Sequence, residues 1–431
     1  MKLAKISLAT LVALGAFSSV ASATPLEEAI KNVDVSGFAR YRYENVNTEE
    51  TVGSKTSAGH KFKFITNFKA AIDDNFFGVV GLRYNKADGS GNAAAGVTDT
   101  TVVNNGGNLN IHQLYLGYTY GNTTVTAGKQ VIGTFFTDDA IGTGAKIVNK
   151  DIEGLTLAAI AFDALENDAQ ESDGALLGFA RGKQAAFKKL SFIAGTGALD
   201  PANTTGTNAE KSYDAGNLYG VAAMGSYDPI SFQLWYASLT NVTDLLALEL
   251  AGDFDVTNDI NVGFKGQFVN SDADSSIKKA APDYNDGKFY AGELSTELYG
   301  VSLAAGYIGY KVDDRGITSF SFEDQGSLID VAEQRNDYVL DYTLIGGKGN
   351  FWFAKLGYGI DKFDLGVDYI AGTAKYKGGK ETDYQEVMPS IAYKYSKKLK
   401  FSTFYSWANI DEKGKDDYDS TKYRFEAKYS F

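Results

Sequence analysis

The sequence predicts an all-β protein, a transmembrane antiparallel β-barrel of about 18 strands (roughly 16 to 18). Three observations carry that prediction. Segments of about ten residues alternate apolar with polar side chains, as in strands that place one face on lipid and the other on water. The connections between these segments alternate between short turns and long loops. The first residues have the pattern of a secretory signal, which directs a chain out of the bacterial cytoplasm.

The composition fits a barrel and excludes several kinds of chemistry. The chain has 431 residues, a net charge of −13, two histidines and no cysteine. Disulfides and thiolate catalysis are therefore excluded. The acidic balance argues against nucleic acid and anionic lipid as partners. After the N-terminal segment no run of about 18 apolar residues occurs, so the sequence predicts no membrane-spanning helix.

Residues 1–23 have the features of a signal peptide. A lysine-containing start is followed by a largely apolar stretch and by an Ala-Ser-Ala cleavage site at residues 21–23. We therefore expect the mature chain to begin at Thr24, and residues 24–431 to form a single barrel domain.

Strand-like alternation starts at residues 33–46 and recurs to the C-terminus. In that first segment the face with Tyr41 and Tyr43 is apolar and the face with Arg40 and Arg42 is charged, because side chains alternate along a strand. In later segments the apolar face is made, in chain order, by Phe62, Phe64 and Phe68; Leu114, Leu116, Tyr118 and Tyr120; Leu246, Leu248 and Leu250; Ile260, Val262, Phe264 and Phe268; Phe363, Leu365, Val367 and Tyr369; Val387, Ile391, Tyr393 and Tyr395. Residues 154–165 would suit a helix or a strand, and the surrounding pattern favours a strand.

The last segment, TKYRFEAKYSF at residues 421–431, alternates most regularly. Its apolar face holds Tyr423, Phe425, Ala427, Tyr429 and Phe431, and its polar face holds Lys422, Arg424, Glu426, Lys428 and Ser430. Such a strand would also suit a soluble sandwich. In a barrel, its pairing with the first strand would close the sheet and remove both edges. Arg424 and Lys428 would then share an inner wall with Arg40 and Arg42.

The connections sort into two kinds. The short ones are residues 73–76, 121–122, 151–153, 228–229, 255–257, 299–300, 360–362 and 396–397. The long ones are residues 47–60, 85–108, 166–215, 271–287, 312–350, 375–384 and 409–420, and the short stretch 241–243 is an exception. Short periplasmic turns opposite long external loops are typical of outer-membrane barrels. A barrel this wide holds an aqueous channel.

The connection at residues 133–144 is the predicted constriction of that channel. It reads GTFFTDDAIGTG, is less polar than the other long connections and carries Asp138 and Asp139. We expect it to fold into the lumen opposite bases at lumen-side positions of early strands, namely Arg40, Arg42, Lys61, Lys63 and Lys129. Acids that face bases create a field across a pore, and rings of charge set ion preference. The alternative is a solvated turn, with the bases scattered along the lumen.

Two further acidic segments resemble cation sites in part. Asp272 and Asp274 occupy the first EF-hand positions, but the sixth position is Ile277 rather than Gly, so a solvated loop is the better interpretation. Residues 323–326 read EDQG within the longest late connection, where they would either fold back to meet a cation or stay on the surface. No nucleophile–base motif is present, so the sequence predicts no enzyme.

Several motifs together resemble one known family. These are TPLEEAIKNVDVSGFARYRYE, QLYLGYTY, AGKQ, TDDAIGTGAKIVN, IEGLTLAA, GNLYGVAAMGSYD, FEDQG and the ending KYSF. The set resembles the major outer membrane protein porins of Campylobacter and its relatives over nearly the whole chain. The resemblance implies an 18-stranded, trimeric, cation-selective porin with an inward-folded third loop and a calcium ion near the constriction.

The same resemblance assigns roles to single residues. Arg40 and Arg42 would line the lumen, Asp138 would lie on the constriction loop, and Glu323 would be a calcium ligand. The family loop reads more like TDNAIDGLVGTG, whereas TDDAIGTG is shorter and lacks the second acid. That departure argues against calcium ligation from this loop.

We therefore expect a bacterial outer-membrane channel for passive diffusion of small hydrophilic solutes and ions, with a preference for cations. Its partners would be outer-membrane lipid, the solutes and two further copies in a homotrimer, and no cofactor is required. Two alternatives remain at this stage. One is a channel that prefers a particular solute, and the other is an adhesin or structural barrel that acts through its external loops.

Overall fold

The computed structural model describes residues 33–50, 53–89, 109–165, 216–257, 259–379 and 381–431. The expected signal peptide, the expected long loop 166–215 and most of the expected loop 85–108 lie outside the described residues.

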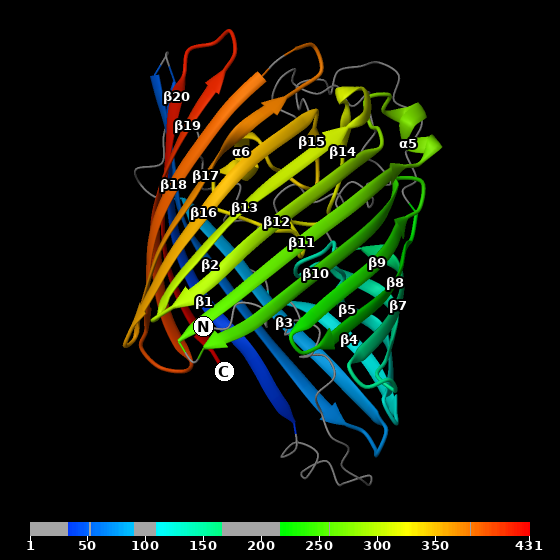
Figure 1. Cartoon of the computed structure of the whole chain (residues 1–431). Coiled ribbons are helices and arrows are strands. Elements are labelled where there is room, and N and C mark those ends of the chain that lie inside the picture. The colour runs from blue at the N-terminus through cyan, green and yellow to red at the C-terminus, as the bar shows by residue number, and fades with distance from the viewer. Residues whose placement is uncertain (1–32, 51–52, 90–108, 166–215, 258, 380) are drawn as a thin grey trace.

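A single antiparallel sheet of 18 strands closes into a barrel (Figure 1). Its strands are β1 (Asp34–Glu50), β2 (Gly53–Ala71), β3 (Phe76–Gly89), β4 (Asn110–Tyr120), β5 (Thr123–Val131), β6 (Ile141–Asn149), β7 (Leu155–Leu165), β8 (Leu218–Tyr227), β9 (Ile230–Leu239), β10 (Thr243–Thr257), β11 (Ile260–Ala273), β12 (Gly287–Leu298), β13 (Val301–Val312), β16 (Lys348–Ile360), β17 (Phe363–Lys375), β18 (Glu381–Lys394), β19 (Leu399–Glu412) and β20 (Tyr418–Ser430). The predicted fold class and strand number are confirmed, and residues 155–165 form a strand.

The first and last strands close the barrel. β1 pairs with β20 in a register that places Arg40 opposite Lys428 and Arg42 opposite Glu426. Past the end of β20, Gly37 and Phe431 exchange two backbone hydrogen bonds of 3.2 and 3.1 Å. This closure leaves no strand edge exposed in the barrel. The pairing that the last segment predicted is confirmed.

The outer face of the barrel is apolar. Its exposed side chains include the residues that the alternation assigned to lipid, among them Leu114, Leu116, Leu246, Leu248, Leu250, Leu365, Val367 and Tyr369. A belt of this kind is what a membrane barrel presents to the bilayer. No helix within the described part of the chain combines the length and apolar character needed to cross a membrane.

Several expected long loops are instead extensions of the strands. Of residues 47–60, expected as a loop, the described residues 47–50 and 53–60 continue the β1–β2 ladder, which is paired as far as Glu50 opposite Gly53. The expected loops 375–384 and 409–420 shrink to residues 376–380 and 413–417. A ladder needs only backbone hydrogen bonds. Above the bilayer both faces of a strand meet water, so the apolar alternation stops before the strand does.

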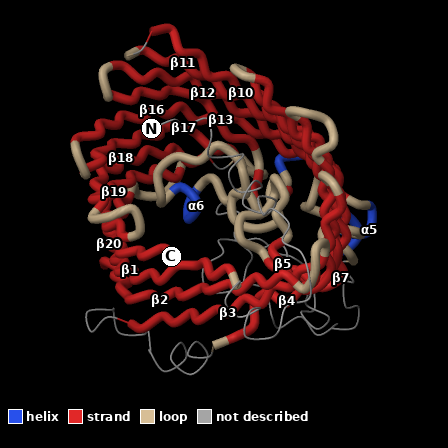
Figure 2. The backbone as a smooth tube through the Cα atoms, turned by 90° about the horizontal axis from the view of Figure 1, so that it is seen from below, coloured by secondary structure: helices blue, strands red, loops and turns tan. Residues whose placement is uncertain are grey.

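The longest late connection, residues 313–347, folds into the barrel rather than over its rim. Figure 2 shows loop segments and α6 (Arg335–Tyr338) inside the ring of strands. The connection also contains η3 (Asp313–Arg315) and a small sheet of β14 (Ile317–Thr318) with β15 (Ile345–Gly346), whereas α5 (Ser275–Ala280) lies between β11 and β12. We call residues 313–347 the β13–β16 loop.

Apolar packing holds this loop in the lumen. Phe320, Phe322 and Leu340 are fully buried, and they belong to one core with the inward side chains of the barrel wall. The ring of Phe289 on β12 lies 5.8 Å from that of Phe320 and 5.5 Å from that of Tyr342. Each such side chain contributes about 1.5–3 kcal/mol when it leaves water. The interior of the barrel is therefore partly a hydrophobic core.

Candidate pore constriction

Two loops meet inside the lumen. The first, residues 132–140 between β5 and β6, is called the β5–β6 loop, and the second is the β13–β16 loop. The N–H of Phe322 donates to the carbonyl of Phe136 at 2.8 Å, and the N–H of Ser327 donates to the carbonyl of Phe135 at 2.8 Å. The rings of Phe136 and Phe322 pack at 5.6 Å. The two loops therefore form one body.

The predicted constriction segment is shorter than the sequence suggested. Residues 141–144 belong to β6, because the N–H of Ile132 donates to the carbonyl of Ala140 at 2.8 Å and closes the loop there. The glycines that gave residues 133–144 a loop-like composition continue the ladder instead, with Gly142 opposite Gln130 and Gly144 opposite Gly128.

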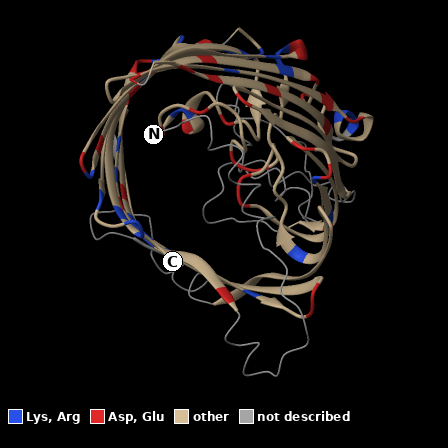
Figure 3. Ribbon diagram, turned by 60° about the horizontal axis from the view of Figure 1, so that its bottom comes forward, with Lys and Arg blue, Asp and Glu red and all other residues tan. Residues whose placement is uncertain are grey.

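A basic wall faces these loops from β19, β20, β1 and β2. Lys63, Arg40, Lys428 and Lys400 lie directly opposite one another on the four adjacent strands. Like charges placed opposite each other repel. The neighbouring row relieves part of that repulsion, because Glu426 accepts from Arg42 at 2.8 Å and lies 3.9 Å from Arg40. Figure 3 shows Lys and Arg along the wall near the C-terminus.

Four of the five predicted bases lie on this wall. Arg40, Arg42, Lys61 and Lys63 occupy the inward face, and Lys61 pairs with the inward Glu44. The fifth, Lys129, was placed on the wrong face. It lies directly opposite Leu114, whose side chain is 54% exposed on the outer surface, and its amine donates to the carbonyl of Ile111 at 3.1 Å. A shift of one residue moves a side chain to the other face of a strand, and such a shift explains this error.

Acidic groups gather where the two loops meet. One carboxylate oxygen from each of Asp139, Glu323 and Asp324 lies within 4.8 Å of the others. The N–H of Asp138 donates to Glu323 at 2.7 Å. The side chain of Glu323 is buried, and burial raises its pKa. Enclosure within the lumen, followed by the neighbouring Asp139, raises the pKa of Asp138.

Of the two places that the sequence leaves open for the EDQG segment, the structure shows the interior one, because Glu323 is buried. It brings Glu323 beside Asp139, the second acid of the β5–β6 loop. Sequence reasoning had set this loop aside as a source of cation ligands, because it is short.

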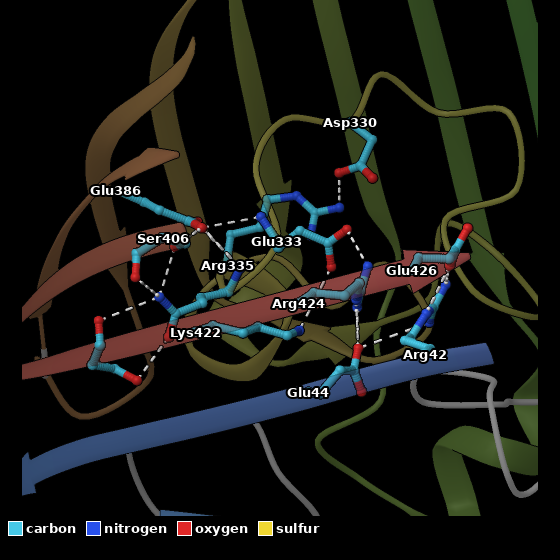
Figure 4. Close-up of polar contacts among 12 residues, drawn as sticks. Arg42, Glu44, Asp330, Glu333, Arg335, Glu386, Ser406, Lys422, Arg424 and Glu426 are labelled. Carbon is cyan, nitrogen blue, oxygen red and sulfur yellow. Dashed lines mark hydrogen bonds and ion pairs between the residues drawn. The ribbon is translucent and has the colours of Figure 1, made fainter. Parts of the chain in front are cut away.

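Ion pairs connect the loops to the basic wall at two places. The amine of Lys63 donates to Asp139 at 2.8 Å. Arg424 donates to Glu333 of the β13–β16 loop at 2.6 Å and to Glu44 at 2.6 Å (Figure 4). Sequence reasoning missed Glu333. The available signal was the apolar content of residues 313–347, which is unusual for an external loop.

The opposite wall is acidic on its periplasmic side. A cavity of about 600 Å³ lies there, and its lining includes Asp253, Asp255, Glu293, Glu297 and Asp330, with Lys265 and Lys355. The amine of Lys355 donates to Glu293 at 3.0 Å. The lumen therefore has one wall with an excess of bases and one with an excess of acids.

Comparisons with known proteins agree with this architecture. A family model described as Campylobacter major outer membrane protein matches residues 1–431. No curated protein matches the chain.

Solved structures with similar folds include three proteins named OccK9, OccD1 and OpdK. OccK9 (OpdG) of Pseudomonas aeruginosa is 15% identical with a TM-score of 0.65, covering 94% of this chain and 100% of that one. A variant of OccD1 (OprD) is 15% identical with a TM-score of 0.63, covering 97% and 99%. OpdK of Pseudomonas aeruginosa, solved with vanillate, is 13% identical with a TM-score of 0.64, covering 93% and 99%.

Proposed function

The chain belongs to the Campylobacter major outer membrane protein family of outer-membrane porins, and we propose that it forms a passive diffusion channel that prefers cations. Porins are channels rather than enzymes. The solutes are small hydrophilic molecules and ions. The observation that carries the proposed preference is the acidic junction of the two loops inside the lumen.

The charge balance around that junction supports cation preference. Several of the wall bases have acidic partners: Arg42 pairs with Glu426, Arg424 with Glu44 and Glu333, and Lys63 with Asp139. Glu323 and Asp324 add negative charge at the junction, and the chain as a whole carries −13. Acidic rings favour cations.

The test is the reversal potential of the channel in a planar bilayer under a salt gradient. We expect the sign that corresponds to cation permeation. A clear anion preference would overturn the proposed selectivity, and an absence of conductance would overturn the proposed channel.

We further propose that the acidic junction binds calcium. Asp139, Glu323 and Asp324 would hold the ion, because carboxylate oxygens are the ligands that Ca²⁺ takes and one oxygen from each of these residues lies within 4.8 Å of the others. The ion would connect the two loops and neutralise part of their charge. Calorimetric titration of the chelator-treated protein with Ca²⁺ should show binding that Glu323→Gln removes and Glu293→Gln leaves intact. Equal binding by all three proteins would contradict this site.

A preference for small carboxylates is the second candidate function. OpdK was solved with vanillate, and the row of Lys63, Arg40, Lys428 and Lys400 is the feature of this chain that would suit a carboxylate. Swelling of protein-containing liposomes in isosmotic solutes of equal size would separate the two functions. Faster entry of a carboxylate than of a neutral sugar supports the second candidate, and equal entry supports general diffusion.

We also propose a homotrimer in the outer membrane, assembled after removal of residues 1–23. Porin trimers that survive mild detergent migrate as a heat-labile band of high mass. A band at the monomer mass both with and without boiling would contradict the trimer.

A further inference from the structure

The middle of the β13–β16 loop is held by one buried carboxylate, that of Glu386 on β18. Glu386 is 1% exposed. It accepts hydrogen bonds from the N–H of Glu333 at 3.1 Å and from the N–H of Gln334 at 3.1 Å. The hydroxyls of Ser406 and Tyr384 also donate to it, at 2.5 and 2.8 Å. A buried carboxylate is tolerated when it is this fully hydrogen-bonded.

Gln334, on the loop side of this contact, is also held by side-chain hydrogen bonds. Gln334 is 1% exposed, and its amide donates to the hydroxyl of Ser406 at 2.7 Å. The hydroxyl of Ser420 donates to the amide oxygen of Gln334 at 2.7 Å. Ser406 lies on β19 and Ser420 on β20, so one residue of the loop is held by the two strands that follow β18 in the sheet. Figure 4 shows Glu386 and Ser406 near the ion pairs of the basic wall.

A second attachment holds the loop on the other side of the lumen. Gln267 on β11 donates to the carbonyl of Ser327 at 2.8 Å and accepts from the N–H of Ile329 at 2.7 Å. Glu249 on β10 fixes that glutamine by accepting from it at 2.6 Å. Glu333, which meets Arg424, lies between this attachment and Glu386, next to Gln334.

We propose that Glu386 is the positioning residue of the pore constriction. It fixes the β13–β16 loop against β18, β19 and β20, and thereby places Glu333 against Arg424 and sets the width of the passage along the basic wall. The proposal rests on the channel function proposed above. Glu386 acts through the loop rather than on the permeating ion, because its carboxylate is buried and occupied by four donors of the described chain.

The role of Glu386 is separable from the stability of the barrel. β18 is joined to β17 and β19 by backbone ladders that do not involve this side chain. Glu386→Gln replaces one acceptor oxygen with an NH₂ group at a place where two N–H groups and two hydroxyls donate. Residues 333–334 should therefore detach from β18 while the barrel stays closed. Hydrogen bonds to a charged group are stronger than neutral ones, and losing one should make detachment of the loop about tenfold more frequent. Each detachment lets the loop move into the passage, so brief closures of the channel should also become about tenfold more frequent.

The test is single-channel recording of Glu386→Gln beside Glu293→Gln in planar bilayers. Glu293→Gln is the matched control, because it removes the same charge from the lumen wall at a residue whose ion pair is with Lys355 of β16. We expect noisy, frequently closing channels from Glu386→Gln alone, with unchanged heat-labile mobility on gels. Quiet wild-type recordings from Glu386→Gln, or equal noise from both variants, would overturn the proposal.

A second variant keeps the test decisive if Glu386→Gln does not assemble. Gln334→Ala removes the contacts to Ser406 and Ser420 from the loop side and leaves every strand intact. It should show the same closures, and quiet channels from it would contradict the anchor. Failure of the proposed function looks different, since wild-type protein would then show no conductance or the opposite selectivity.

Discussion

The two sides of the lumen differ in what they present to water. The wall of β19, β20, β1 and β2 carries charged side chains toward the passage, including Arg40 and Lys428. The wall of β12, β13 and β16 carries Phe289, Ile308 and Phe351, which are all fully buried under the β13–β16 loop. Apolar side chains inside a water-filled barrel must be covered, because exposing them to water is costly. The distribution of apolar and charged inward residues therefore decides where the loop lies and where the passage remains.

The largest expected effect comes from uncovering the apolar wall. Phe320→Ala should cost about 3–5 kcal/mol of packing between loop and wall. The loop should then leave its place and single-channel conductance should rise. Phe38→Ala is the matched control, because it removes the same atoms from the basic wall, where Phe38 packs under Lys428. A conductance change of equal size in both variants would show that the two walls do not differ in this way.

The next effect concerns the charge of the loops. Asp138→Asn combined with Asp139→Asn should shift the reversal potential toward anions, since Lys63 loses its partner. A unit charge about 4 Å from an ion in water contributes about 1 kcal/mol, so loss of the Asp139 charge alone should lower the permeability ratio about fivefold. An unchanged permeability ratio would mean that the path of the ions does not run near this junction.

A smaller effect is expected from pH. Burial raises the pKa of Glu323, and enclosure in the lumen raises the pKa of Asp138. A raised pKa means that protonation, which removes the negative charge, starts at a higher pH than for an ordinary carboxyl group. Cation preference should therefore begin to fall, as pH is lowered, before exposed carboxylates titrate. The measurement is the reversal potential across a pH series. Cation preference that falls only in the pH range where exposed carboxylates titrate would contradict this prediction.

The smallest effect is expected from the residue that lies outside the lumen. Lys129→Gln should leave conductance and selectivity unchanged, whereas Lys63→Gln should strengthen cation preference. Both variants remove one positive charge from an early strand. A similar shift of the reversal potential in both variants would show that Lys129 faces the lumen.

The sequence predicted the barrel, its closure and the inward position of Arg40, Arg42, Lys61 and Lys63. It could do so because strand alternation is local and repeats along each segment. It left open whether the segment at residues 323–326 folds inward, because that outcome depends on partners far away in the chain, such as Phe289 for Phe320.

Two other features escaped prediction for physical reasons. Residues 47–60 lack the apolar alternation, although the β1–β2 ladder continues through residues 47–50 and 53–60. The contact between Glu386 and Gln334 joins residues 52 positions apart, which no local period encodes.

The central claim is that ions pass along the basic wall and not along the covered one. The chain has no cysteine, so single cysteines report on position without background. Arg42→Cys and Ile308→Cys both place a thiol on the inner face, the first on the basic wall and the second beneath the β13–β16 loop. A charged methanethiosulfonate added during recording should reduce current through Arg42→Cys and leave Ile308→Cys unaffected. Equal or faster modification of Ile308→Cys would contradict this account.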